Sequence, residues 1–340
     1  MDRKDFSEIL YSSVIPEGTP FEEIKTKTQP IRDAIRQMLP SSLFRFRAYT
    51  NLSKNAFKDD VIYAVTADKF NDPFDTLAGY DIEGIKKGVN FIMDADALTH
   101  LKSWFEDGKD LPDILKQTIP ENLCKNLREI ILAVEDYNLI KERIEEQKKQ
   151  LMLQIQTFFP IISEFTKKMS TVACFCESVQ SVLMWSHYAN LHTGFALEYD
   201  FRPLLDSPIK NVGIYPVLYE KERRDFSSYF AWAFFLINGI RINNPDISSS
   251  IKYALSKYVA WEYEKEWRLI DYTSRYFDDT KPSAISYSPV AIYYGQHMKR
   301  RNRSILHKIA QEKGIREYEM YIDYSSPAFE MKYRPALFGK

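Results

Sequence analysis

The chain has 340 residues, enough to bury a core in one large domain or in two moderate ones. Its 46 basic and 47 acidic side chains leave a net charge of -1, which gives no global charge signature for nucleic-acid binding. Three cysteines are too few for a disulfide framework, and the sequence contains neither a signal peptide nor a run of about 18 apolar residues. We therefore expect a cytoplasmic protein with no membrane partner.

Helical patterns occur at the start and in the middle of the chain. Residues 1–40 predict a helical lead-in, in which apolar residues recur at helical spacing until Pro40 ends the pattern. Residues 110–169 contain no glycine and carry apolar residues at helical spacing, so they predict a helical insertion. Residues 221–260 and 301–313 are also expected to be helical.

The remaining segments are rich in β-forming residues, and several alternate between apolar and polar positions. The predicted strands are LFRFRAY (43–49), VIYAVTA (61–67), VACFCES (172–178), GFALEYD (194–200), VGIYPVLYE (212–220), EKEWRLIDY (264–272), AISYSPVAIYYG (284–295) and EYEMYIDYS (317–325). These elements predict a single α+β domain over residues 1–340, with a mixed or antiparallel strand-rich core and a helical insertion.

The acidic segment WEYEKEWRL, residues 261–269, is the most informative for chemistry. A strand beginning at Glu264 would project Glu264, Glu266 and Arg268 from the same face. The three side chains could form a ladder of ion pairs on the protein surface. Alternatively, one carboxylate orients a hydroxyl or nucleophile while the other stabilises the positive charge that develops on a sugar during glycosyl transfer.

Two arginines of the first predicted strand, Arg45 and Arg47, project from one of its faces. Arginine is permanently charged and grips phosphate through two parallel hydrogen bonds, so this pair suits a ligand with a pyrophosphate group. The alternative is that both arginines form ion pairs with Asp72 or Asp75.

FNDPFD, residues 70–75, predicts a rigid loop because proline, asparagine and aspartate favour turns. Asn71 and Asp72 can accept hydrogen bonds from neighbouring backbone amides. We expect Phe70 and Phe74 to anchor the turn in the core. The alternative is that the turn borders a ligand pocket.

MWSHYANLHTG, residues 184–194, contains two of the five histidines. His187 and His192 are five positions apart, so they do not share a helix face as an i, i+4 metal-binding pair does. We expect His187 to be a hydrogen-bonded, partly buried residue that positions a loop, with Tyr188 beside it at a pocket. No bound metal ion is expected.

In this order, the segments LFRFR, FNDPFD, CFCE, MWSHYANLHTGFALEYD, WEYEKEWRL and AIYYG resemble the bacterial family catalogued as domain of unknown function 2971. The resemblance covers residues 40 to 300, interrupted by the predicted insertion. It carries no activity with it, because the function of that family is unknown.

The candidate residues also resemble the ADP-ribosyltransferases in their order along the chain. That superfamily has an Arg or His on an early strand, a Ser, Thr or Tyr on the next, and E-x-E or a single Glu on a late strand. The resemblance implies that Arg45 or Arg47 holds NAD and that Tyr63 or Thr66 supports the nicotinamide ribose.

The same resemblance implies that Glu266 stabilises the oxocarbenium ion and that Glu264 orients the acceptor. The acceptor is a protein, a nucleic acid or a small molecule, and the enzyme would act in phage defence or as a toxin. It also implies an ADP-ribosyltransferase-like form of the α+β fold. The sequence departs from the superfamily at residues 64–66, where Ala-Val-Thr replaces its Ser-Thr-Ser run.

Two other functions remain open. A non-enzymatic sensor of ligands or proteins in defence or stress would have a closed aromatic core around MWSHYA and both glutamates held in salt bridges. A metal-dependent nuclease or phosphohydrolase would need Asp72, Asp75 and Glu266 to converge on a divalent ion. The transferase hypothesis requires Arg45 or Arg47, Tyr63 or Thr66, and Glu266 to line one open cleft. A Glu266 buried in a salt bridge, with the arginines on the opposite face of the sheet, would count against it.

Overall fold

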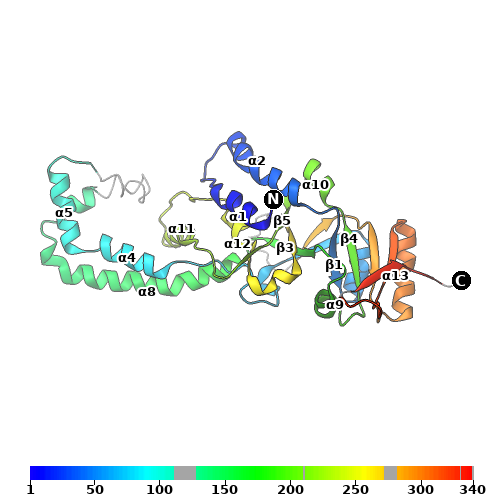
Figure 1. Cartoon of the computed structure of the whole chain (residues 1–340). Helices are drawn as coiled ribbons and strands as arrows, with labels where there is room; N and C mark the ends of the chain where they lie inside the picture. Colours follow the sequence, from blue (N-terminus) through cyan, green and yellow to red (C-terminus); the bar gives the residue numbers. More distant parts are fainter. Residues whose placement is uncertain (111–127, 210, 272–281, 330, 339–340) are drawn as a thin grey trace.

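The computed structural model describes residues 1–110, 128–209, 211–271, 282–329 and 331–338 (Figure 1). Its helices are α1 (Arg3–Ser12), α2 (Phe21–Met38), α3 (Asn51–Lys58), α4 (Ile82–Ile92), α5 (Ala95–Glu106), α8 (Lys141–Thr166), α9 (Val182–Tyr188), α10 (Arg202–Asp206), α11 (Ser227–Ile237), α12 (Ser249–Tyr253) and α13 (Arg300–Lys313), with the short 3-10 helices η1 (Ala67–Lys69), η2 (Asn138–Ile140) and η3 (Val259–Glu264).

The strands are β1 (Leu43–Arg47), β2 (Val61–Thr66), β3 (Thr171–Cys176), β4 (Phe195–Tyr199), β5 (Val212–Pro216), β6 (Leu218–Glu220), β7 (Ser256–Tyr258), β8 (Glu266–Asp271), β9 (Ser283–Ser286), β10 (Ala291–Tyr294), β11 (Arg316–Tyr321) and β12 (Lys332–Pro335). Ten of them form one mixed sheet, and β6 pairs with β7 in a separate two-stranded sheet. The expected α+β fold class is therefore confirmed.

The ten-stranded sheet consists of two parts that meet at one residue pair. One part has the strand order β12-β11-β10-β4-β1, and the other has the order β5-β8-β3-β2-β9. β1 pairs with β3 at one position, Phe44 opposite Cys176. On the same edge of β3, β2 pairs only at the other end, opposite Thr171 and Val172. The sheet therefore opens between β1 and β2, along residues 173–175 of β3, and we call this opening the fork.

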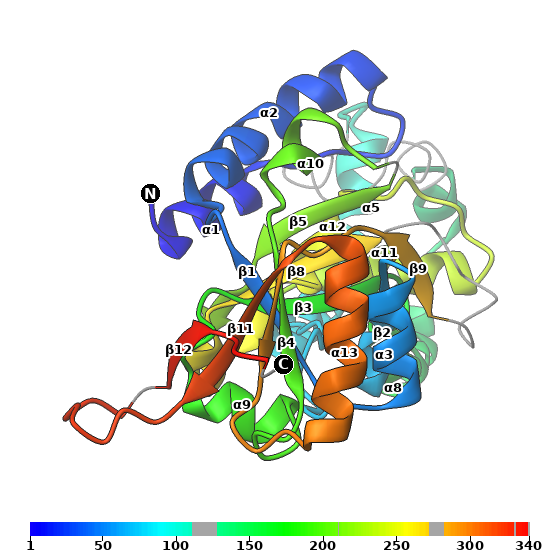
Figure 2. The same cartoon turned by 90° about the vertical axis from the view of Figure 1, so that its right-hand side faces the viewer.

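Helices cover both faces of the sheet. The larger core lies under α1, α2, α3 and α13, which contribute buried side chains such as Phe6, Ile35, Phe57 and Leu306. Figure 2 shows α13 crossing in front of the strands, with α1 and α2 to one side of them. A smaller core on the other face contains Trp185 of α9. The fork thus lies between two packed layers.

A helical arm made of α4, α5 and α8 extends away from the sheet (Figure 1). The 26-residue helix α8 packs against α11 through aromatic contacts, including Phe159 with Phe230 at 5.3 Å between ring centroids. The arm begins at Ile82, earlier than the insertion expected at 110–169, and residues 111–127 of that insertion lie outside the described residues. The division into lead-in, insertion and single domain stays a prediction.

Two local expectations were wrong, and one strand was not anticipated. The segment 221–260 was expected to be helical throughout, but residues 256–258 form strand β7. β8 begins at Glu266, so Glu264 lies before the strand. β12 was not expected from the sequence.

Among the described residues, no helix combines the length and the apolar character that crossing a bilayer requires.

Candidate functional site

A pocket of about 430 Å³ occupies the fork, and we call it the fork pocket. This volume lies within the range of roughly 300–1,000 Å³ typical of small-molecule sites. Its lining includes Arg45 and Arg47 from β1, Cys174 from β3, Asn71 from the loop after β2, His187 and Tyr188 from α9, Lys257 from β7, Glu264 from η3 and Glu266 from β8. Most of the predicted site residues therefore gather at one opening in the sheet.

The two arginines form a cationic end of this pocket. The alternation of β1 places Arg45 and Arg47 on one face, as expected, and both are partly buried. Arg45 Nη2 donates a 2.6 Å hydrogen bond to the carbonyl of Tyr63, which links β1 to β2 across the fork. The Arg45 guanidinium carbon lies 5.6 Å from the centre of the Phe175 ring.

No carboxylate among the described residues lies within ion-pair distance of either arginine, so the expected pairing with Asp72 or Asp75 is wrong. Burial, and next the neighbouring charge of Arg47, lower the pKa of Arg45 to about 10. Burial also lowers the pKa of Arg47. A bound anion would raise the pKa of both arginines again, because it supplies the missing counter-charge in a poorly solvated place.

An ion cluster of five buried residues also borders the pocket: Asp75, Lys257, Glu264, Glu266 and Arg268. All of them except Arg268 line the pocket. Lys257 Nζ lies 2.5 Å from Glu264 Oε2 and 2.7 Å from Glu266 Oε2. Arg268 Nε lies 2.8 Å from Glu266 Oε1, and its Nη2 lies 2.7 Å from Asp75 Oδ1. Three carboxylates thus share two cations.

The two glutamates respond differently to this environment. Burial by itself raises the pKa of Glu266, but Arg268 and then Lys257 outweigh it and hold that pKa below its usual value. Burial raises the pKa of Glu264, which Lys257 only partly offsets while Glu266 raises it further. Glu264 is therefore the carboxyl of this pair that takes up a proton more readily.

The two glutamates converge because the backbone turns sharply between them. Lys265 ends η3 with φ 44° and ψ 51°, in the left-handed region, and its side chain is exposed. This turn lets Glu264 and Glu266 bind the same Lys257 ammonium, although only Glu266 belongs to the strand. Non-glycine residues rarely adopt this conformation without a cost of order 1 kcal/mol.

Lys265 gives a direct test of this turn. Lys265→Val is expected to lower the free energy of unfolding by about 1–3 kcal/mol, because a β-branched residue is strained at positive φ. Lys265→Gly, which adopts this region freely, is expected to be at least as stable as the wild type. Urea denaturation of the three proteins measures the difference, and a valine variant as stable as the glycine variant would contradict the geometry.

Three predicted site residues, Tyr63, Thr66 and Asp72, are absent from the lining of the fork pocket. Thr66 is buried on the other face of β2 from Val65, which lines the pocket. Tyr63 contributes its carbonyl group to Arg45, and its ring is absent from the lining. The hydroxyl that reaches the pocket belongs instead to Tyr188, which donates a 2.7 Å hydrogen bond to Glu264 Oε1.

The FNDPFD loop is a fixed turn, as expected, but its two phenylalanines differ. Asp72 Oδ1 accepts a 2.9 Å hydrogen bond from the Phe74 amide and so caps the turn. Phe70 lines the fork pocket, with its ring 5.6 Å from the Arg268 guanidinium carbon. Phe74 is 61% exposed, so the expectation that it anchors the turn in the core is wrong. Asn71 lines the pocket.

The histidines of MWSHYANLHTG have separate places. His187 lines the fork pocket, but it is exposed rather than partly buried, and among the described contacts it makes no side-chain hydrogen bond. His192 lies 3.2 Å from Ser186 Oγ and stacks on Trp185. Sequence reasoning missed Lys257, because β7 is too short to show a strand pattern.

The two ends of the fork pocket come from opposite faces of the sheet. Phe44 opposes Cys176, and Cys176 opposes Glu266, so these three side chains share one face. Arg45 and Arg47 project from the other face of β1. In a continuous sheet a layer of backbone would separate the two sets. Because the sheet is open at the fork, one pocket touches both sets. Glu266 is nevertheless buried in salt bridges on the face opposite the arginines, which is the arrangement that counts against the transferase hypothesis.

Residues 184–269 match the family model described as "Protein of unknown function (DUF2971)", which confirms the family resemblance for the segments MWSHYANLHTGFALEYD and WEYEKEWRL. The matched segment runs from α9 into β8 and includes Tyr188, Lys257, Glu264 and Glu266. No curated protein and no solved structure matches the chain.

Proposed function

We propose that the fork pocket binds NAD and that the protein transfers ADP-ribose from NAD to an acceptor. The observation that best supports this proposal is the joining of two charged ends in one pocket of small-molecule size. Arg45 and Arg47 suit the pyrophosphate, because guanidinium groups bind phosphate oxygens in pairs. The nicotinamide ribose would then lie toward Glu264.

The reaction breaks the bond between ribose C1′ and the nicotinamide nitrogen, and nicotinamide leaves with the bonding electron pair as a neutral molecule. Positive charge develops on the ribose, and a fixed carboxylate nearby stabilises it. A nucleophilic atom of the acceptor forms the new bond to C1′ and releases its proton to a base. We assign both carboxylate tasks to Glu264.

Glu264 suits these tasks better than Glu266, to which the resemblance gave the central role. Glu266 is committed to Arg268 and Lys257, and its lowered pKa makes it a poor base. Glu264 has a raised pKa and lines the pocket, and the Tyr188 hydroxyl holds one of its oxygens. Lys257 Nζ also lies 2.5 Å from Glu264 Oε2, and both glutamates line the pocket, so we base the assignment of the reacting role to Glu264 on its raised pKa.

The test incubates the protein with NAD and measures the released nicotinamide by chromatography. Glu264→Gln is expected to lower the rate about 100-fold or more, as losing a preorganised electrostatic group does. Its thermal stability should equal or exceed that of the wild type, because the change removes one of three carboxylates that share two cations. Glu266→Gln should instead unfold more easily.

Glu262→Gln serves as the matched control, because Glu262 is exposed in the same segment. Equal rates for the wild type and Glu264→Gln would remove the role given to Glu264. The acceptor is left open in this assay, since water can take its place and nicotinamide is released in either case.

A specific observation also favours a second candidate, a non-enzymatic ligand sensor. Both glutamates are held in salt bridges and Trp185 is fully buried, which are the features expected for that function. NAD that binds by calorimetry without any nicotinamide release would support the sensor. The nuclease alternative lacks such support, because the guanidinium of Arg268 contacts both Asp75 and Glu266.

A further inference from the structure

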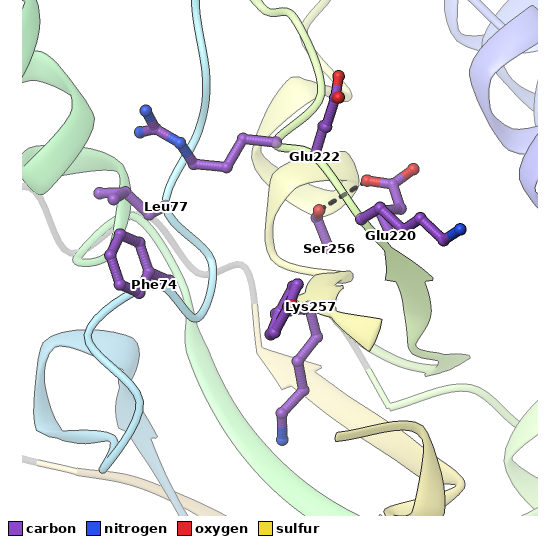
Figure 3. Close-up of a pocket in the computed structure, with 9 residues that line it drawn as sticks. Phe74, Leu77, Glu220, Glu222, Ser256 and Lys257 are labelled. Atoms are coloured by element: carbon purple, nitrogen blue, oxygen red, sulfur yellow. Dashed lines mark hydrogen bonds between the residues drawn. The ribbon is translucent and has the colours of Figure 1, made fainter. Parts of the chain in front are cut away.

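A second pocket of about 410 Å³ lies on the other side of β7 from the ion cluster, and we call it the second pocket (Figure 3). Successive side chains of a strand project to opposite faces. Ser256, Lys257 and Tyr258 of β7 all line the second pocket, and the Lys257 side chain extends to Glu264, so Lys257 borders both pockets. Figure 3 shows Ser256 hydrogen-bonded to Glu220, with Lys257 extending away from both. The two pockets are therefore back to back, with β7 as a common wall.

The FNDPFD turn forms the other part of this wall. Asp75 turns into the ion cluster, whereas Phe74 lines the second pocket. Phe74 is 61% exposed and Tyr258 is 52% exposed, so two aromatic rings of one pocket keep about half of their surface open to solvent. Exposed aromatic surface in a pocket provides a stacking platform for a planar group.

The segment after β6 adds positive charge to the second pocket. Lys221 and Arg223 are exposed and line it, and neither has a carboxylate partner among the described residues. The neighbouring Arg224 does have partners. It lies 2.5 Å from Glu220, and its guanidinium carbon lies 3.6 Å from the centre of the Tyr11 ring. Within the described part of the chain, the lining thus has two cationic side chains without an ion-pair partner and one carboxylate without such a partner, that of Glu222.

The segment that carries these cations is fixed in position. The Gly79 amide donates to the carbonyl of Arg224 at 3.2 Å, and the Phe226 amide donates to the carbonyl of Gly79 at 3.0 Å. A Cβ atom at Gly79 would lie 2.8 Å from that Arg224 oxygen and 2.9 Å from Arg223 Cβ, so only glycine allows this approach. Backbone hydrogen bonds thus hold the Phe74 side and the Arg223 side of the pocket together.

We propose that the second pocket is a separate binding site for a nucleotide. The base would stack on Phe74 or Tyr258, and the phosphate would bind Lys221 and Arg223. A free mononucleotide and the terminal nucleotide of a single strand share this chemistry. The site does not depend on NAD chemistry in the fork pocket, although β7 places its ligand directly beside Lys257.

Equilibrium dialysis of the full-length protein with radiolabelled AMP tests the free nucleotide, and fluorescence anisotropy with a short 5′-phosphorylated single-stranded oligonucleotide tests the strand end. Saturable binding of either probe is expected. At least one of Tyr258→Ala and Phe74→Ala, the variant that removes the stacking ring, should weaken it roughly fivefold to 150-fold, the effect of losing 1–3 kcal/mol of stacking. Tyr258→Phe should retain it, and Lys221→Glu combined with Arg223→Glu should abolish it.

All four side chains are exposed, so these variants are expected to fold, which their melting curves check. Tyr324→Ala is the matched control, because Tyr324 is an aromatic residue that is 89% exposed outside both pockets. The Arg45→Ala, Arg47→Ala double variant disables the fork pocket and should leave this binding unchanged.

Three results would overturn the site: no saturable binding of either probe, unchanged binding in Tyr258→Ala and Phe74→Ala, or loss of binding only in the Arg45, Arg47 double variant. The last result would move the nucleotide to the fork pocket. A failure to release nicotinamide from NAD, by contrast, would count against the proposed function and leave the second pocket intact.

Discussion

Replacing Arg268 by methionine is expected to lower the free energy of unfolding by about 3–5 kcal/mol, as breaking a buried ion pair on one side does. The Arg268 side chain is fully buried, and its guanidinium contacts both Asp75 and Glu266. Without it, three buried carboxylates would share the single ammonium of Lys257. Uncompensated buried charge is among the most destabilising changes that one substitution makes.

Urea denaturation measures this loss, and Arg36→Met is its matched control. Arg36 lies 2.7 Å from Asp206 but is 55% exposed, so its removal should cost less than about 1 kcal/mol. Asp75→Asn placed in the Arg268→Met protein should recover part of the loss, because it removes one uncompensated charge. If Arg268→Met and Arg36→Met lowered the free energy of unfolding by similar amounts, the ion cluster would have to be solvated.

The same variant carries a pH dependence of definite sign. In the wild type the pKa of Glu266 is below its ordinary value of 4.5, so its stabilising contribution is present above that value and is lost as pH falls. Removing Arg268 removes the main cause of the lowered pKa. The stability difference between the two proteins should therefore shrink as pH falls below 4.5.

Trp185→Ala is expected to cost about 3–5 kcal/mol, the range for removing a large buried aromatic side chain. Trp185 is fully buried, packs edge-on against Phe46 at 5.0 Å, and donates a 2.6 Å hydrogen bond from its indole nitrogen to the carbonyl of Val179. Alanine would leave a cavity under α9 and an unsatisfied carbonyl. Because α9 also carries Tyr188, ligand affinity at the fork pocket should fall with stability.

Calorimetric melting compares this variant with Trp104→Ala in the helical arm. Trp104 is 41% exposed, so its removal takes less apolar surface out of the core and should lower Tm by a much smaller amount. If both variants lose the same Tm, the smaller core around α9 contributes little to the stability of the folded chain.

Local sequence patterns predicted the parts of the site that depend on one element alone. The alternation in LFRFR placed Arg45 and Arg47 on one face, and turn chemistry predicted the role of Asp72. The fork was not predictable in this way. It arises because β8 occupies one edge of β3 while β1 and β2 share the ends of the other edge, and such long-range pairing leaves no mark on a single strand.

The acidic segment shows the same limit. E-x-E suggested two carboxylates on one strand face, but they converge through a left-handed turn at Lys265, where no glycine marks it. Phe74 was assigned to the core because large aromatic residues are usually buried, whereas here it lines an open pocket. In both cases tertiary contacts decided the geometry of the residues.

The single bridge between Phe44 and Cys176 also bears on how the molecule can deform. Elsewhere each half of the sheet is stiffened by continuous hydrogen-bonded ladders, but at the bridge one residue pair carries the backbone connection between the halves. A ligand that spans the fork would contact β1 on one side and β7 and β8 on the other. It would therefore link the two halves of the sheet. Its binding energy would then resist their separation as well as hold the ligand.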